Sequence, residues 1–362
     1  MRSEEMLAAI RGMRFDGRDA GRPLTLMEVC GTHTMAIAKA GLRQLLPPSV
    51  RLISGPGCPV CVTPAGALDA VLDFAMREDV ILTSYGDLLR VPGSRRGDHL
   101  LARRAKGADV RMVYSPMDAL ELAKKTPGKQ IVFLAVGFET TAPGTAACIL
   151  TAQEENADNF SVLCLMKYTV PALRAILNDP ACSVDGLICP GHVAAITGSD
   201  AFDFIPREYG LPAAVGGFDG GDVIAAVHAL CDMRAKGIAQ MVNCYERVVS
   251  AQGNRAALAA MEAVFEPADD VWRGLGLLPM SGMRIREAYS RYDAAKRFNI
   301  EGLDRDIEKA GGCRCGDVLR GVIAPQECPL FGRVCTPADP VGPCMVSGEG
   351  ACAAAYKYQG IV

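Results

Sequence analysis

The sequence predicts an α/β fold with two similar lobes, each built on a parallel sheet, followed by a mostly helical and irregular C-terminal domain. Short β-branched runs alternate with helix-length amphipathic segments, which is typical of parallel strands joined by crossover helices. The alternation stops after about residue 240. Beyond that point, six of the fifteen cysteines follow residue 312 in a stretch rich in glycine and proline.

Composition limits the classes of function. The 362-residue chain carries a formal net charge of −3, so it shows no electrostatic footprint for nucleic acid. No run approaches the length of a membrane span, and the charged N-terminus lacks the apolar core of a secretory signal. We therefore expect a cytoplasmic protein. In that reducing compartment, clustered cysteines more often bind metal or perform redox chemistry than form structural disulfides.

Eight strands are expected, in two sets of four whose members are spaced by about one βα unit. The strands are Leu24–Val29, Arg51–Ser54, Val80–Ser84 and Val110–Tyr114, then Gln130–Val136, Ser161–Leu165, Gly186–Cys189 and Ala213–Gly216. We therefore predict a first lobe over residues 20–125, a second lobe over residues 126–238 and a C-terminal domain over residues 239–362.

Helices are expected around Arg255–Phe265 and Arg284–Arg291, at the start of the C-terminal domain. The N-terminal residues 1–19 read as a charged amphipathic helix that could pack with this domain. The remainder of the domain is too rich in loops to fold on hydrophobic burial alone. Small irregular modules of this kind commonly need a metal or cluster to hold them together.

Glycine-rich loops with reactive or polar side chains follow six of the predicted strands. Because parallel sheets bind ligands beyond the carboxyl ends of their strands, we expect these loops to line shared crevices. The loops are CGTH at 30–33, GPGCPVC at 55–61, YGD at 85–87, GFETTAP at 137–143, PGHV at 190–193 and GGFDGGD at 216–222.

The C-x-x-C spacing of Cys58 and Cys61 allows two thiolates to bind one metal ion or to form a reversible disulfide, and a structural turn is the third alternative. Cys30 ends the neighbouring predicted strand, so its thiol could approach the pair across the crevice. His33 offers an imidazole ligand or proton donor, or alternatively a helix cap. Three thiolates and an imidazole would suit iron(II) or zinc.

The C-terminal cysteines are spaced for a [4Fe–4S] cluster, which is held by four cysteine thiolates. Structural zinc usually uses close cysteine pairs with two to four residues between them, which this segment lacks. Zinc binding and dithiol chemistry are therefore the less favoured alternatives. The pattern is C-x12-C-x6-C-x16-C through Cys315, Cys328, Cys335 and Cys352, with Cys313 as an alternative first ligand and Cys344 not excluded.

Three polar residues lie beside glycines at predicted strand ends. Glu139 and His192 could act as general acid and base or orient a small anion. Their structural alternatives are a helix cap for Glu139 and a hydrogen-bonded turn for His192. Asp87 is a similar case, with a helix N-cap as its alternative.

The chain resembles the HypD family of [NiFe]-hydrogenase maturation factors from Leu24 to Tyr358, nearly its full length. Several motifs in the same order carry the resemblance. They are MEVCGTHT (27–34), GPGCPVCVTP (55–64), YGDLLRVPG (85–93), GFETTAP (137–143), PGHV (190–193), CRCGDVLRG (313–321) and SGEGAC (347–352).

The resemblance implies a role in building the Fe(CN)2CO group of the hydrogenase active site. Such proteins act with HypC, a small chaperone, receive cyanide from HypE, and serve the hydrogenase large subunit indirectly. The resemblance implies that Cys30, Cys58 and Cys61 surround the iron(II) under assembly, and that the C-terminal cluster exchanges electrons with that site. The implied proton or anion handlers are His33, Asp87, Glu139, His192 and Glu349.

Rival functions share these residues. A cluster-dependent dithiol/disulfide reductase would reduce the Cys58–Cys61 pair, whereas a non-catalytic scaffold would bind iron and partner proteins without chemistry. A zinc-stabilised nucleotide-binding protein is a third alternative, although the loop at 216–222 matches neither G-x-G-x-x-G nor a Walker motif. We expect a redox-active assembly scaffold rather than a conventional turnover enzyme.

Overall fold

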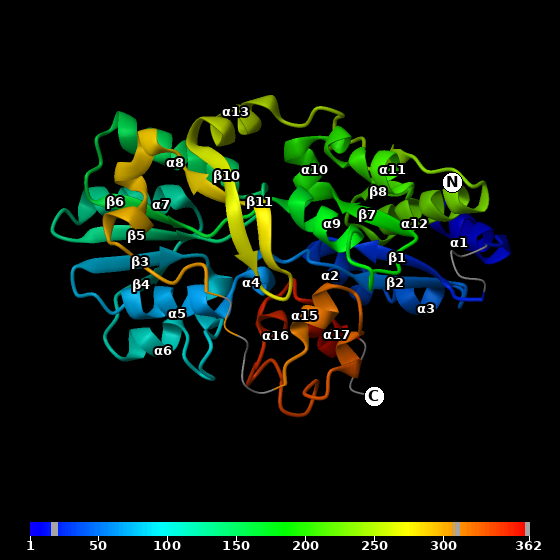
Figure 1. Ribbon diagram of the computed structural model, residues 1–362, viewed down its shortest axis with the longest axis horizontal. Helices are drawn as coiled ribbons and strands as arrows, with labels where there is room; N and C mark the ends of the chain where they lie inside the picture. The colour runs from blue at the N-terminus through cyan, green and yellow to red at the C-terminus, as the bar shows by residue number, and fades with distance from the viewer. Residues whose placement is uncertain (16–20, 306, 308–311, 359–362) are drawn as a thin grey trace.

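The computed structural model describes residues 1–15, 21–305, 307 and 312–358, and its fold is α/β with two parallel sheets, as predicted. Each sheet forms the centre of one lobe, and the C-terminal segment packs at the junction between the lobes (Figure 1). The ends of the predicted N-terminal helix and of the C-terminal domain fall partly outside the described residues. None of the described helices combines the length and the apolar character needed to cross a membrane.

The strand order is β2-β1-β7-β8-β9 in the first sheet and β4-β3-β5-β6 in the second, and all pairs within them are parallel. All eight predicted strands are confirmed, with small differences at their ends. They are β1 (Leu24–Glu28), β2 (Val50–Ser54), β3 (Val80–Ser84), β4 (Val110–Met112), β5 (Gln130–Ala135), β6 (Phe160–Cys164), β7 (Gly186–Pro190) and β8 (Ala213–Gly216), to which the structure adds β9 (Met241–Asn243).

The grouping of strands into lobes differs from the sequence-based one, which placed the first four strands within residues 20–125 and the next four within 126–238. The chain instead leaves the first sheet after β2, builds the whole second sheet from β3 to β6, and returns to place β7 beside β1. Strand spacing predicts the length of a βα unit but not which strands pair. The pairing of Leu26 with Gly186 joins distant parts of the sequence.

Helices flank both sheets, and α1 packs against α12 of the first lobe rather than against the C-terminal domain. The α-helices of the lobes are α1 (Ser3–Gly12), α2 (Gly31–Lys39), α3 (Leu42–Leu45), α4 (Pro59–Val62), α5 (Ala65–Phe74), α6 (Leu100–Ala105), α7 (Pro116–Lys125), α8 (Ala142–Glu154), α9 (Thr169–Leu177), α10 (Gly191–Thr197), α11 (Phe204–Tyr209) and α12 (Gly220–Ala235). Later in the chain come α13 (Arg255–Val264), α14 (Ala294–Arg297), α15 (Cys315–Leu319), α16 (Pro343–Val346) and α17 (Ala351–Tyr358), and the 3-10 helices are η1 (Gly86–Arg90), η2 (Ser199–Phe202), η3 (Glu287–Tyr292) and η4 (Pro325–Glu327).

An antiparallel hairpin that the sequence analysis missed crosses between the lobes (Figure 1). It consists of β10 (Phe265–Trp272) and β11 (Gly276–Ile285). The helix expected at Arg255–Phe265 is confirmed as α13, whereas the one expected at Arg284–Arg291 is the end of β11 followed by η3. A register shift between Ala268 and Asp270 interrupts the alternation by which a strand is recognised in a sequence.

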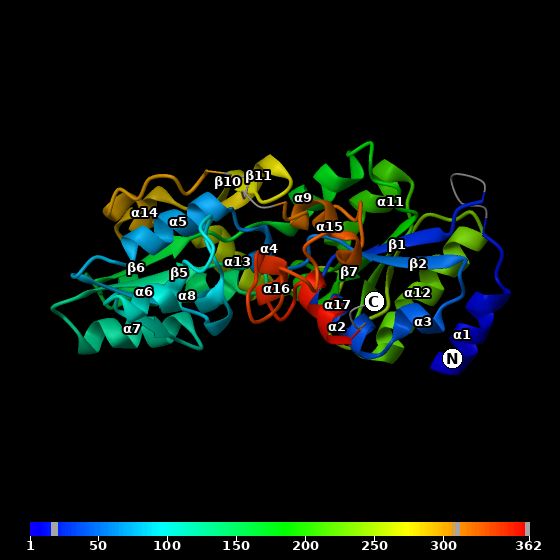
Figure 2. The ribbon, with the colours of Figure 1, turned by 90° about the horizontal axis from the view of Figure 1, so that it is seen from below.

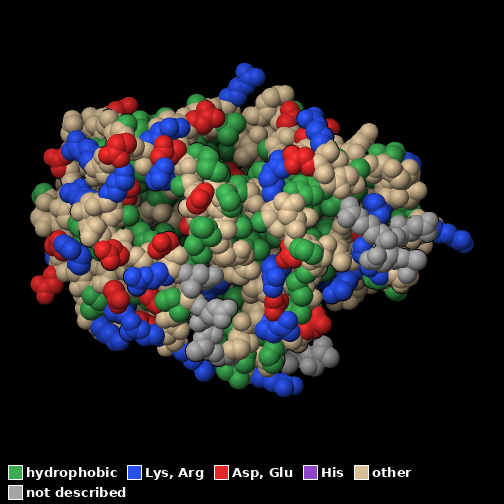
Figure 3. Space-filling model, viewed as in Figure 1, with side chains coloured by type: hydrophobic (Ala, Val, Ile, Leu, Met, Phe, Trp, Pro, Cys, Tyr) green, Lys and Arg blue, Asp and Glu red, His purple; other side chains and the backbone are tan. Residues whose placement is uncertain are grey.

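The two lobes and the C-terminal segment share one core. The largest cluster of buried apolar residues extends from Leu82 and Leu134 of the second sheet to Leu187 of the first and to Cys344 of the C-terminal segment. Seen from below in Figure 2, the short helices α15, α16 and α17 lie between the lobes, and α17 packs against α2. On the face shown in Figure 3, acidic and basic side chains intermix and hydrophobic ones gather near the middle.

Candidate functional site

The carboxyl ends of both sheets meet at one crevice between the lobes. The strand order changes direction between β1 and β7 in the first sheet and between β3 and β5 in the second. Such switch points are where parallel α/β sheets bind ligands. The segments that follow these four strands line the crevice together with part of the C-x-x-C loop, and its polar lining residues include Cys30, Asp87, His192 and Glu349.

Two glycines allow three segments to meet beside Cys30. The Gly31 amide donates to the Gly57 carbonyl at 2.9 Å. A Cβ atom on Gly57 would lie 2.4 Å from the Cys30 backbone, and one on Gly31 would lie 2.4 Å from the Cβ atom of Glu349. Any side chain at either position would therefore separate the Cys30 turn from its neighbours.

Cys30 is the N-cap residue of α2 and is 8% exposed. Burial raises its pKa to about 12; the backbone amide of His33 opposes the rise, and the carboxylates of Glu349 and Glu28 add to it. Glu28 is fully buried and accepts a hydrogen bond from the Cys30 amide at 3.1 Å. At neutral pH the thiol stays protonated unless a bound metal ion displaces its proton.

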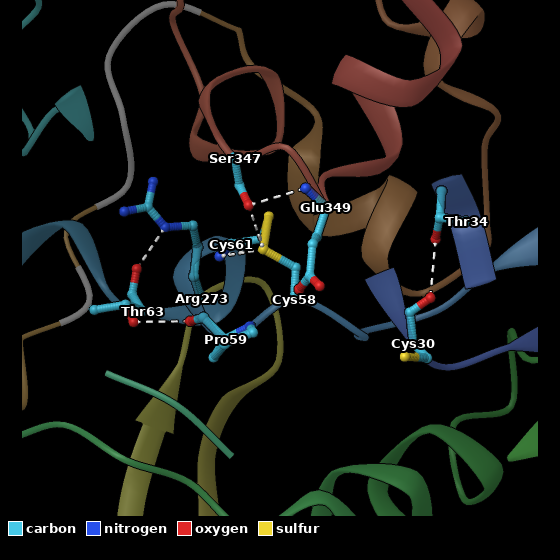
Figure 4. The surroundings of a disulfide bond; sticks show 9 residues. All are labelled: Cys30, Thr34, Cys58, Pro59, Cys61, Thr63, Arg273, Ser347 and Glu349. Atoms are coloured by element: carbon cyan, nitrogen blue, oxygen red, sulfur yellow. Dashed lines mark hydrogen bonds between the residues drawn. A yellow bond between two sulfur atoms is a disulfide. The ribbon is translucent and has the colours of Figure 1, made fainter. Parts of the chain in front are cut away.

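Cys58 and Cys61 form a disulfide, one of the three alternatives that the C-x-x-C spacing allowed. Cys58 is the N-cap of α4, and its sulfur accepts a hydrogen bond from the Cys61 amide at 3.2 Å. The hydroxyl of Ser347, from the C-terminal segment, lies 3.3 Å from the same sulfur (Figure 4). Both cysteines are buried, so the surrounding protein controls access to the bond.

The predicted grouping of Cys30 with Cys58 and Cys61 as three metal ligands is not present in this structure. Figure 4 shows Cys30 apart from the Cys58–Cys61 disulfide, with Glu349 drawn beside Cys58. Across the described ranges, no three His, Cys, Asp or Glu side chains are arranged to hold a metal ion. Among the described residues that line the crevice, Cys30 is the one cysteine.

Six cysteines of the C-terminal segment line a single apolar pocket. The Val341 amide donates to the sulfur of Cys335 at 3.3 Å. Burial raises the pKa of Cys352, and the nearby thiols of Cys313, Cys335 and Cys328 raise it further, so these groups interact electrostatically. The pocket is lined by Cys313, Cys315, Cys328, Cys335, Cys344 and Cys352, together with Leu330, Phe331 and Met345.

This donor set fits a [4Fe–4S] cluster. Four thiolates are required, and six cysteines are available around an apolar space. Hydrogen bonds from backbone amides to sulfur, as at Cys335, are among the interactions that tune such clusters. A cluster also keeps its ligand sulfurs farther apart than a single metal ion does, so these thiols need not meet the close grouping that a single ion requires among the described residues. Cys344, left open by sequence reasoning, lies in the pocket with the five expected cysteines.

The disulfide and the cysteine pocket are direct neighbours. Helix α16 packs against α4, which carries Cys61. Cys344 on α16 lines the pocket, and Ser347 at the C-terminal end of the same helix contacts Cys58. One short helix thus connects two groups of thiols that are far apart in the sequence.

Two carboxylates flank the crevice thiol. Glu349 accepts a hydrogen bond from the Thr32 hydroxyl at 2.9 Å. Burial of the carboxyl raises the pKa of Glu349, the Thr32 hydrogen bond opposes this, and the negative charge of Asp87 adds to the rise. Asp87 lies in η1, and partial desolvation raises its pKa also. The two groups are therefore suited to accept and release protons nearer neutral pH than ordinary carboxylates do.

The rings of the two site histidines both stack on the ring of Phe218. His33 stacks on its ring at 4.8 Å between centroids, and His192 stacks at 3.8 Å. His33 is fully buried, and its Nε2 lies 3.0 Å from the Gly217 carbonyl. Burial lowers its pKa to about 4, so it stays neutral and acts structurally, as a link between α2 and the loop after β8. His192 lines the crevice, where partial burial lowers its pKa.

Glu139 has a structural partner. Its buried carboxylate accepts hydrogen bonds from the backbone amide and hydroxyl of Thr169, at 2.8 and 2.7 Å, and so caps the first turn of α9. Burial raises its pKa. The next two residues in the chain, Thr140 and Thr141, line the crevice in its place. The position of Glu139 therefore corresponds to the helix-cap alternative.

Sequence reasoning missed three residues that contact the site. The Glu28 carboxylate accepts a hydrogen bond from the Cys30 amide, and Ser347 contacts the disulfide. Arg273 of the hairpin donates a hydrogen bond to the backbone at the end of α4. Ser347 could have been found from its place in the SGEGAC motif beside Glu349. Nothing in the spacing of Arg273 or Glu28 marks them, because their partners lie in other elements of the fold.

Comparison with known proteins gives one consistent result. The family described as "HypD: Hydrogenase formation hypA family" matches residues 3–359. The chain is 46% identical to hydrogenase maturation factor HypD2 of Bradyrhizobium diazoefficiens, over 94% of this chain and 90% of that protein. It is 46% identical to HypD of Rhodobacter capsulatus, over 95% and 92%, and 43% identical to HypD of Escherichia coli, over 94% and 90%.

Proposed function

Because this chain belongs to the HypD family of hydrogenase maturation factors, we propose that it is the scaffold on which the Fe(CN)2CO group of a [NiFe] hydrogenase is assembled. The observation that carries the proposal is the direct contact of three parts: the crevice with Cys30, the Cys58–Cys61 disulfide and the cysteine pocket. A scaffold that both holds iron and changes its ligands needs a binding thiol and a redox group in reach of each other.

In this proposal, iron(II) is the cargo and Cys30 is its ligand from this chain. Cys30 is buried and has a raised pKa, so metal binding would release its proton. The carboxylates of Asp87 and Glu349 are placed to receive it. A second thiolate would come from a HypC-type chaperone bound at the rim, where Tyr114 is 85% exposed. A HypE-type protein would donate cyanide, and the hydrogenase large subunit would receive the product in the cytoplasm.

The cysteine pocket would hold a [4Fe–4S] cluster through Cys328, Cys335, Cys352 and one of Cys313, Cys315 or Cys344. Such a cluster exchanges single electrons when bound. Opening the Cys58–Cys61 disulfide takes two electrons and two protons and yields two thiols, with an external one-electron donor protein as the source of the electrons. Where the Cys58 thiol then releases its proton, the Ser347 hydroxyl would donate a hydrogen bond to the resulting thiolate and stabilise it.

The decisive experiment compares three variants of the protein purified anaerobically with its small chaperone. Wild type should contain about four irons and about four acid-labile sulfides from the cluster, with further cargo iron, and should show infrared bands of bound cyanide and carbon monoxide. Cys328→Ala should lose the cluster. Cys30→Ser should keep the cluster but lose the infrared bands, and Cys231→Ala, in the apolar core, should match wild type. A wild-type protein without iron, or Cys30→Ser with unchanged bands, would contradict the proposal.

The disulfide specifically favours a second function, that of a cluster-dependent dithiol/disulfide reductase. The Cys58→Ala variant distinguishes the two. A reductase would lose all turnover with this variant, whereas a scaffold would still carry iron and bind its partner, with a slower attachment of the diatomic ligands.

A further inference from the structure

Arg273 occupies the turn of the β10–β11 hairpin and attaches it to α4. Its backbone amide donates to the Val62 carbonyl at 2.8 Å, and its Nε donates to the Thr63 carbonyl at 2.8 Å (Figure 4). These carbonyls follow directly after Cys61, at the C-terminal end of α4. Arg273 thus contacts the helix that carries the disulfide.

The same turn contacts the cysteine-rich segment. Gly274 has φ +78°, and a Cβ atom there would lie 2.4 Å from the Cα atom of Gly316 on α15. Gly316 directly follows Cys315, which lines the cysteine pocket. The hairpin turn therefore lies between the two groups of thiols. The close approach of its backbone to α15 leaves no room for a side chain at position 274, so this residue must be glycine.

Arg273 is a buried cation without a carboxylate partner among the described residues. It is 6% exposed, and its Nη2 has no hydrogen-bond acceptor there. Lys167, which packs on the same hairpin and is also buried, is by contrast paired with Asp270. Burying a charge without a partner costs on the order of several kcal/mol of folding free energy. We therefore expect a compensating negative charge near the Arg273 guanidinium.

The cysteine pocket adjoins the turn that carries Arg273, because Gly316, which the backbone of Gly274 approaches, directly follows the pocket residue Cys315. A [4Fe–4S] cluster bound by four thiolates carries net negative charge, and this charge grows by one unit on reduction.

We propose that Arg273 is a positioning residue that supplies the counter-charge of the cluster site and joins it to the disulfide helix. The inference rests on the proposed function in one respect, the presence of the cluster. A fixed buried cation stabilises the more negative, reduced state, so it raises the reduction potential of the cluster. Its two hydrogen bonds to the end of α4 keep this charge beside the disulfide as well.

The test is a redox titration of the cluster in the full-length protein, followed by electron paramagnetic resonance. Arg273→Gln keeps a hydrogen-bond donor but removes the charge, and Arg273→Lys keeps the charge but removes the guanidinium geometry. Arg320→Gln is the matched control, because Arg320 adjoins α15 but is partly exposed and paired with Asp317. We expect Arg273→Gln to disfavour reduction about tenfold, or about 59 mV for a one-electron couple, with Arg273→Lys and Arg320→Gln within about threefold of wild type.

The outcomes separate charge from packing. Loss of iron and sulfide in Arg273→Gln with retention in Arg273→Lys would also support the proposal, because charge alone distinguishes the two variants. Equal shifts in both variants, loss of the cluster in both, or an unchanged potential in Arg273→Gln would overturn it. A wild-type protein without iron and sulfide would overturn the proposed function itself, and the inference with it.

Discussion

Cys30 stands on a helix that continues from a buried strand, whereas the six cysteines of the C-terminal segment stand on short helices and turns between residues 313 and 352. The turn of Cys30 is fixed by sheet pairing, by two glycine contacts and by the Glu28 carboxylate. The C-terminal segment has only short helices, and four of its six cysteines are buried beside apolar side chains such as Leu319, Phe331 and Met345. A hydrophobic scaffold thus positions one thiol, whereas the other region gathers six thiols around one pocket.

The largest effect that would sharpen this comparison is expected from Cys352→Ser. Because binding of a metal group supplies folding free energy to small irregular modules, amide protection from exchange in residues 312–358 should fall on the order of 100-fold or more, while the two sheets keep theirs. Hydrogen exchange with mass spectrometry measures both regions. Cys244→Ser, outside the pocket, is the control. Unchanged protection in Cys352→Ser would mean that the segment folds by burial alone.

A backbone change should disturb the crevice without touching a thiol. Gly57→Ala places a Cβ atom 2.4 Å from the Cys30 backbone, so the free energy of unfolding should fall by about 3 kcal/mol. Denaturant titration measures it. Gly144→Ala, where a Cβ atom meets open space within α8, should instead stabilise the protein by about 0.5 kcal/mol. Similar small effects in both variants would show that the crevice wall is adaptable.

The pH dependence of stability should distinguish the two histidines beside Phe218. Burial lowers the pKa of His33 from 6.5 to about 4, so its contribution is complete above about pH 6.5 and is lost as the pH falls toward 4. Between pH 7 and pH 4.5 the free energy of unfolding of the wild type should therefore fall by about 2 kcal/mol more than that of His33→Gln, as measured by unfolding at both pH values. His192 is exposed, so the His192→Gln variant should lose as much stability at pH 4.5 as the wild type does. An identical pH dependence in wild type and His33→Gln would contradict the assignment.

The smallest effect concerns the contact between the two regions. Ser347→Ala removes the hydroxyl beside Cys58, which favours the thiolate over the disulfide. The dithiol–disulfide equilibrium in glutathione buffers should therefore move about fivefold toward the disulfide, since one hydrogen bond contributes about 1 kcal/mol. Ser183→Ala, at an exposed position, should not move it. A shift toward the dithiol in Ser347→Ala would reverse the role given to Ser347.

Much of the site was predictable because its chemistry lies in local motifs. Cys30, Asp87 and His192 each follow a strand of recognisable length, and all three line the crevice. The six C-terminal cysteines could be recognised by type alone, and they share a pocket. The roles of Glu139 and His33 were less predictable, since a carboxylate or imidazole beside a glycine looks the same whether it faces a ligand or a buried backbone group. Their burial and partners decide between these alternatives.

The sequence by itself determined the α/β class, eight strands of the two parallel sheets, the loops at the carboxyl ends of these strands and the two groups of thiols, because local propensity and motif spacing act within short segments. The tertiary structure decided that β7 pairs with β1, that the hairpin crosses between the lobes, and that α16 lies against α4. These are contacts between distant segments, and they depend on which buried surfaces fit together. The neighbourhood of disulfide, cysteine pocket and Arg273 therefore exists only in the folded chain.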